Sequence, residues 1–115
     1  MNITPHNKLM DLTDKVAIVT GGSVGIGFGI SYRLAEAGVH VIIAARRLDE
    51  AQKTATELRE KGYKADAVQT DVSVEGDVKN LVAQAVEKGG HIDILVNNAG
   101  IFPFSSLSEL TAETF

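Results

Sequence analysis

The residues from Thr20 to Gly27 include Gly21, Gly25 and Gly27 where an apolar run gives way to a helical pattern. Glycine lets the backbone adopt positive φ and approach a ligand that a β-carbon would hold off. A helix that begins in this turn directs free N–H groups and the positive end of its dipole to the same place. We therefore predict a turn that cradles a phosphate; taken alone, the stretch also fits an ordinary strand-to-helix turn. The predicted contacts are Thr20, Gly21, Ser23, Gly25, Ile26 and Gly27.

Two further motifs follow later apolar stretches, Asp71-Val72 and Asn97-Asn98-Ala99-Gly100. Together with Thr20-Gly21-x-x-x-Gly25-x-Gly27, and in this order, they resemble the short-chain dehydrogenase/reductase family over residues 13–115. The resemblance implies a Rossmann-type fold, a nicotinamide cofactor and hydride transfer to or from a small-molecule carbonyl or alcohol substrate. It also implies a homo-oligomer as one possible state of the full-length form.

The resemblance assigns roles to the two later motifs. Asp71 accepts a hydrogen bond from the adenine amino group, and Val72 packs on the adenine ring. Asn98, Ala99 and Gly100 lie beside the ribose nearest the nicotinamide, where an Asn side chain ties neighbouring strands together. An alternative role for Asp71 is that of a turn aspartate that helps Ser73 to cap the next helix, and one residue can fill both roles.

Arg46 and Arg47 follow an apolar strand pattern at the position where a dinucleotide fold meets the adenosine ribose. An acidic residue there holds the 2′-hydroxyl of NAD, whereas a basic residue accommodates the 2′-phosphate of NADP. Ala45 occupies the acidic position, and Arg46 can grip a phosphate with its planar fork. We therefore predict NADP, with NAD less favoured. The alternative is that both arginines only solvate the end of a strand.

The elements that position these residues follow from hydrophobic periodicity. A continuous apolar run of the kind that parallel sheets bury predicts a strand at 15–20, and a high density of β-branched residues predicts one at 39–45. Further strands are predicted at 64–70, where the apolar content is small, and at 91–96. Patterns of period 3.6 predict helices at 25–37, 48–61 and 74–88. The predicted fold class is α/β: a Rossmann-type doubly wound parallel sheet, incomplete, with four strands in the order 3-2-1-4 and helices on both faces.

Several side chains are assigned to faces by the same patterns. Ile26, Ile30 and Leu34 form the predicted sheet-facing stripe of the first helix, in which Gly29 suggests close packing on a strand. Leu48 and Val74 begin the apolar stripes of the second and third helices. His40 is interpreted as a strand-edge residue rather than a metal ligand, because no second ligand stands at a suitable spacing.

Composition limits the classes of function. The 115 residues carry a net charge of -4 without a basic cluster, which argues against nucleic acid as a partner. No apolar run approaches the length of a membrane span, and no targeting segment precedes the pattern, so we expect a cytoplasmic protein. The absence of cysteine excludes thiolate chemistry. Residues 1–12 are expected to be a disordered lead-in, and residues 13–115 one NAD(P)-binding domain.

The catalytic half of the family's pattern is missing. The family uses a Tyr-x-x-x-Lys pair to move the alcohol proton, but Tyr32 is followed four residues later by Glu36 and Tyr63 by Ala67. We therefore predict no catalytic residue and no metal site here. The chain is expected to be the N-terminal NADP-binding portion of an oxidoreductase, truncated before the catalytic half, inactive alone and marginally stable. The alternative is a non-catalytic dinucleotide-binding or subunit-interaction module.

Overall fold

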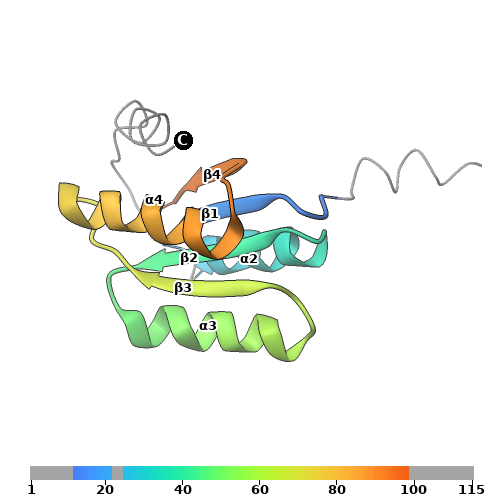
Figure 1. Ribbon diagram of the computed structural model, residues 1–115. Helices are drawn as coiled ribbons and strands as arrows, with labels where there is room; N and C mark the ends of the chain where they lie inside the picture. Colours follow the sequence, from blue (N-terminus) through green and yellow to red (C-terminus); the bar gives the residue numbers. More distant parts are fainter. Residues whose placement is uncertain (1–11, 22–24, 99–115) are drawn as a thin grey trace, which may run out of the picture.

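A four-stranded parallel sheet forms the centre of the protein (Figure 1). The computed structural model describes residues 12–21 and 25–98. The strand order is β3-β2-β1-β4, which confirms the predicted topology. The strands are β1 (Val16–Thr20), β2 (His40–Ala45), β3 (Ala65–Gln69) and β4 (Ile94–Asn97). The helices are α2 (Gly25–Glu36), α3 (Leu48–Glu60) and α4 (Glu75–Gly89).

The two inner strands are the most deeply buried. All five residues of β1 and the last five of β2 are buried, as expected for strands covered on both faces. In the parallel register, Ala17 of β1 lies opposite Val41 of β2 on one side and Ile94 of β4 on the other. The carboxyl ends of all four strands therefore meet at one edge of the sheet.

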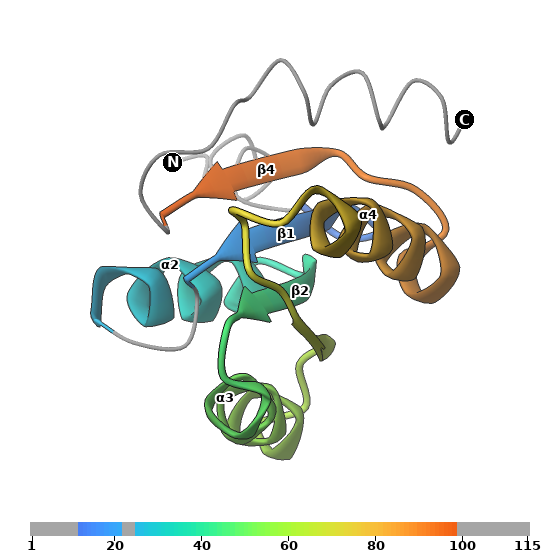
Figure 2. The same ribbon diagram turned by 90° about the vertical axis from the view of Figure 1, so that its left-hand side faces the viewer.

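The helices cover opposite faces of this sheet (Figure 2). On one face, α2 and α3 pack over alternate residues of β1 and β2, among them Val19 and Ile43. On the other face, α4 packs through Leu81 and Ala85 over the strand residues that point the opposite way, among them Ile18 and Ile42. No helix within the described residues is long and apolar enough to cross a membrane.

The sheet-facing stripe of α2 differs from the predicted one. Its buried residues are Gly27, Ser31 and Ala35, whereas Ile26 is 77% exposed. The prediction failed because it followed hydrophobicity, while the close approach of α2 to β1 demands small side chains. The Ser31 hydroxyl is satisfied inside the helix, since Oγ donates to the Gly27 carbonyl oxygen at 2.9 Å.

Three other assignments of side chains to faces were wrong. A β-carbon added to Gly29 would have nothing within 4 Å, so this glycine does not pack on a strand. Leu48 and Val74 are 37% and 45% exposed, because both stand at the very start of their helices, beyond the sheet that the later turns cover. The buried residues of these helices begin at Ala51 and Val78.

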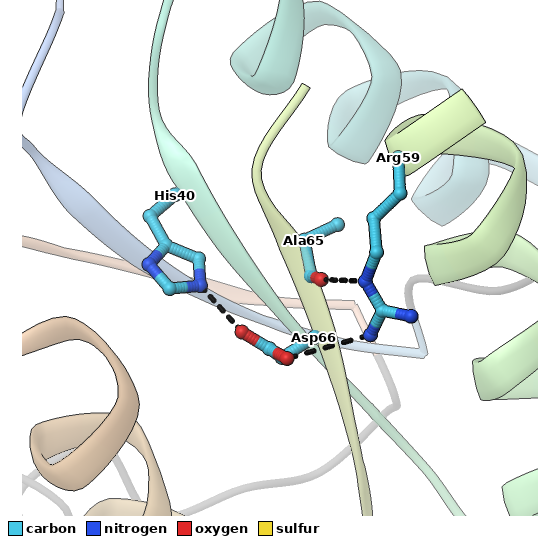
Figure 3. Close-up of polar contacts among 4 residues, drawn as sticks. All are labelled: His40, Arg59, Ala65 and Asp66. Atoms are coloured by element: carbon cyan, nitrogen blue, oxygen red, sulfur yellow. Dashed lines mark hydrogen bonds and ion pairs between the residues drawn. The ribbon is translucent and has the colours of Figure 1, made fainter. Parts of the chain in front are cut away.

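A polar network lies along the outer strand β3 (Figure 3). Arg59, in the last turn of α3, donates from Nε to the Ala65 carbonyl oxygen at 2.7 Å. Lys64 turns its own carbonyl toward β2, where it accepts from Val41 N–H, so the Ala65 carbonyl points to the free edge. The Asp66 carboxylate contacts Arg59 Nη2 at 3.4 Å and His40 Nε2 at 2.6 Å. His40 is the first residue of β2.

Candidate functional site

Two of the three glycines singled out in the turn have the positive φ that the sequence predicts, and Gly27 does not. Gly21 and Gly25 adopt φ of 66° and 55°, a region that favours glycine. Gly21 N–H donates to the Ala44 carbonyl oxygen at 2.8 Å, which fastens the start of the turn to β2. A β-carbon on Gly25 would meet no atom of residues 12–21 or 25–98 within 4 Å, so these residues leave space open at the amino end of α2. Ser23 lies outside the described residues.

Gly27 lies where three segments converge. A β-carbon on Gly27 would stand 2.0 Å from the Gly21 carbonyl oxygen and 2.7 Å from Asn98 Nδ2. Only glycine allows the first turn of α2 to lie against both the end of β1 and the residue after β4. Ile26, beside it, projects an exposed apolar side chain.

Thr20 ties the ends of β1 and β4 together. Its hydroxyl oxygen accepts from Asn98 N–H at 3.0 Å and lies 3.2 Å from Asn97 Oδ1 and 3.3 Å from the Val96 carbonyl oxygen. Thr20 is fully buried. The tie between β1 and β4 therefore runs through the threonine hydroxyl, which contacts both the Asn97 side chain and the Asn98 backbone. Ala99 and Gly100 lie outside the described residues.

The two arginines after β2 have different partners. Arg47 contacts Asp49 at 3.3 Å and Glu50 at 3.9 Å, both in the first turn of α3. Arg46 instead reaches across to the end of β3, where its Nε lies 3.9 Å from Asp71 Oδ2. Its side chain is 79% exposed and stands at the carboxyl edge of the sheet.

Asp71 forms a turn with Ser73, but Ser73 does not cap α4, because the N-cap of this helix is Val74, without a side-chain hydrogen bond. Asp71 Oδ1 accepts from the Ser73 hydroxyl at 2.6 Å and from Ser73 N–H at 2.9 Å. The hydroxyl bond, followed by the backbone bond, lowers the pKa of Asp71 below its ordinary value, and nearby Arg46 adds to the effect. The other carboxylate oxygen is the one that faces Arg46. Val72 is partly buried against Val78 and Val82.

Gln69 and Asp77 contribute to this edge without having been predicted. Gln69 Nε2 donates to the Arg46 carbonyl oxygen at 3.2 Å, and Asp77 Oδ2 accepts from Asp71 N–H at 2.9 Å. Gln69 could have been predicted as part of this edge, because it is a polar residue at the end of a strand that lies next to β2. An acid in the first turn of α4 was the signal for Asp77.

A sequence model of the short chain dehydrogenase family matches residues 15–115. The chain belongs to this family. Among its short-chain dehydrogenase relatives, an uncharacterized oxidoreductase of Thermotoga maritima is 44% identical over 104 residues, covering 89% of this chain and 40% of that protein. The short-chain dehydrogenase/reductase homolog YusS of Bacillus subtilis is 39% identical, covering 91% of this chain and 97% of that protein.

Solved structures of the family superimpose closely. Hydroxysteroid dehydrogenase from Escherichia coli gives a TM-score of 0.85 at 32% identity, covering 90% of this chain and 51% of that one. An actinorhodin polyketide ketoreductase variant with NADPH gives 0.72 at 44% identity, covering 76% and 33%. A 7α-hydroxysteroid dehydrogenase with NADH gives 0.82 at 31%, covering 90% and 49%. The chain spans 40% of the Thermotoga relative and about half of the hydroxysteroid dehydrogenases.

Proposed function

We propose that this chain binds NADP at the carboxyl edge of its sheet, as the coenzyme-binding part of a short-chain dehydrogenase that acts on a carbonyl or alcohol. The residues fit such a coenzyme. The turn from Gly21 to Gly27 leaves open space at Gly25 for a diphosphate, and Asp71 and Val72 flank the same edge. The bound nicotinamide supplies or accepts the hydride, while this chain's residues bind and orient the coenzyme.

The different orientations of the two arginines carry the preference for NADP. Both side chains are largely exposed, but Arg47 pairs with the acids of its own helix, whereas Arg46 extends across the coenzyme edge and pairs with Asp71. Ala45 stands where an NAD-preferring protein presents a carboxylate, so nothing at that position repels a 2′-phosphate. The related structures include one complex with NADPH and one with NADH, so they do not favour either coenzyme. The preference for NADP therefore rests on the charge of the residues at this edge.

The preference can be tested with the adenosine ends of the two coenzymes. Calorimetric titration should show tighter binding of 2′,5′-ADP than of 5′-AMP. Arg46→Ala should reduce the affinity for 2′,5′-ADP about tenfold, the effect of one charge-assisted contact. Arg47→Ala is the matched control and should change it little. Equal affinity of the unaltered chain for the two ligands would refute the NADP assignment.

Coenzyme binding without turnover is the expected behaviour of these 115 residues. They contain no Tyr-x-x-x-Lys pair, so no group is placed to move the substrate proton. The match to YusS over 97% of that protein favours a second candidate function, a coenzyme-binding module without chemistry of its own. Carbonyl reduction with NADPH, measured on the 115 residues, should not exceed the protein-free control. Turnover above that control would contradict both the inactive coenzyme-binding part and the module without chemistry.

A further inference from the structure

A row of nitrogen-bearing side chains lies along the amino edge of the sheet. Lys15 directly precedes β1, His40 begins β2 and Lys64 directly precedes β3. His91 follows α4 on the approach to β4. Because the four strands are parallel, these side chains share the edge opposite the candidate coenzyme site. They cannot take part in coenzyme binding.

The four side chains line one hollow. Its volume is about 280 Å³, and Asp14 is the single carboxylate in its wall. The backbone of Gly38 and Gly89 completes part of the lining. The hollow is large enough for a small polyatomic anion, and the side chains around it include two ammonium groups and two imidazoles.

The carboxylates next to the hollow, Asp66 and Asp93, contact the two imidazoles and do not contact the two lysines. Asp66 contacts His40 Nε2 and Arg59, and Figure 3 shows the second ring nitrogen of His40 pointing away from Asp66. Asp93 accepts from Val16 N–H and from His91 Nε2, each at 2.8 Å. Each ring is thereby fixed by a carboxylate that does not itself line the hollow.

Lys15 and Lys64 have no ion-pair partner within residues 12–21 and 25–98. One purpose they could serve is to balance the negative dipole ends of the three helices, which also finish at this edge. Each helix, however, carries its own basic residue in its last turn. These residues are Arg33, Arg59 and Lys88. Within the described part of the chain, the helix ends therefore do not require the two lysines, which can serve another anion.

We propose that this hollow binds a small oxyanion of the phosphate class, with Lys15 and Lys64 supplying the positive charge and His40 and His91 lining the wall. Lysine ammonium groups bind phosphate as point charges and tolerate many geometries. The site is separate from the coenzyme edge, so phosphate and coenzyme bind the same chain together.

Histidine ring resonances give a direct readout, because the described coenzyme-edge residues include no histidine. Inorganic phosphate, pyrophosphate and glycerol 3-phosphate are titrated separately at constant pH, with sodium chloride at matched ionic strength as the reference. The His40 and His91 signals, assigned by substituting each histidine in turn, should shift along saturable curves. Tighter binding of the inorganic anions identifies free phosphate as the ligand, and tighter binding of glycerol 3-phosphate identifies the phosphate of an organic molecule.

Lys15→Gln and Lys64→Gln should each weaken binding about fivefold or more, while Lys53→Gln should not. Lys53 likewise has no ion pair with the residues that the structure describes, and it does not line the hollow. Lys15 and Lys64 are exposed, and a circular dichroism spectrum confirms that the variants fold. The shifts should persist with NADP at saturation. The proposal is overturned if the shifts rise linearly, if chloride reproduces them, if NADP abolishes them, or if the folded lysine variants bind as tightly as the unaltered chain.

Discussion

Gly27 lies so close to Gly21 that a β-carbon on Gly27 would stand 2.0 Å from the Gly21 carbonyl oxygen. The contact is with backbone, which cannot move aside as a flexible side chain would. We expect Gly27→Ala to lower the free energy of unfolding by on the order of 3 kcal/mol, through forced overpacking. Urea denaturation measures the change.

Gly29→Ala provides the matched control in the same helix. Its β-carbon would meet nothing within 4 Å, so the substitution should stabilise α2 by about 0.5–1 kcal/mol through helix propensity. If the two alanine variants had similar stabilities, the tight approach of the turn to α2 would be disproved.

Thr20→Val tests the tie between β1 and β4. The change preserves the shape of the buried side chain but removes the acceptor of the Asn98 N–H. We expect a loss of about 1–3 kcal/mol in the free energy of unfolding, the effect of leaving a polar group unpaired. Hydrogen exchange at the Asn98 amide should accelerate. Thr20→Ser retains the hydroxyl and should protect that amide as the unaltered chain does; rapid exchange in this variant would contradict the assignment.

Asp71 provides a pH-dependent prediction. Its pKa is lowered in the folded chain, first by the Ser73 hydroxyl and then by Ser73 N–H. A carboxyl with a depressed folded pKa contributes stability above its unfolded pKa and loses it as the pH falls through the folded value. Ser73→Ala should therefore raise the pKa of Asp71 toward its ordinary value, as measured by carbon NMR titration of the carboxyl group. An unchanged titration curve would exclude the Ser73 hydroxyl as the main cause of the lowered pKa.

Arg59→Ala tests whether the free edge of β3 is protected. The substitution removes the guanidinium that covers the Ala65 carbonyl oxygen and contacts Asp66. Exposed strand edges pair with other chains, so the variant should associate more strongly with rising concentration in light scattering. Lys53→Ala, on the same helix, should behave as the unaltered chain does. Equal association of both variants would show that Arg59 does not guard this edge.

The sequence was sufficient to predict the strand order and the element bounds within a few residues. β1 is a continuous apolar run and β2 is apolar after His40, and glycine-containing or acidic motifs follow β1, β3 and β4. The sequence did not predict which face α2 buries. Ile26 is more hydrophobic than Gly27, but the backbone of the turn lies so close to α2 that only the glycine fits on the buried face.

Partners across strands were also missed, for a different reason. The contact of His40 with Asp66 joins residues 26 apart and depends on the register of β2 with β3. The same holds for Gln69, which reaches Arg46 because its strand ends beside Ala45. Periodicity identifies a strand but does not align it with its neighbour. The different partners of Arg46 and Arg47 likewise required atomic positions.

The guanidinium of Arg59 makes the two edges of the sheet unequal in their ability to pair with a further strand. On the β3 side, one outward carbonyl is already bonded, and a charged group lies beside it. On the β4 side, the described residues pair only with β1, through Ile94 to Asn97. A further parallel strand, from this chain or from another, would therefore pair with the free edge of β4 rather than with that of β3.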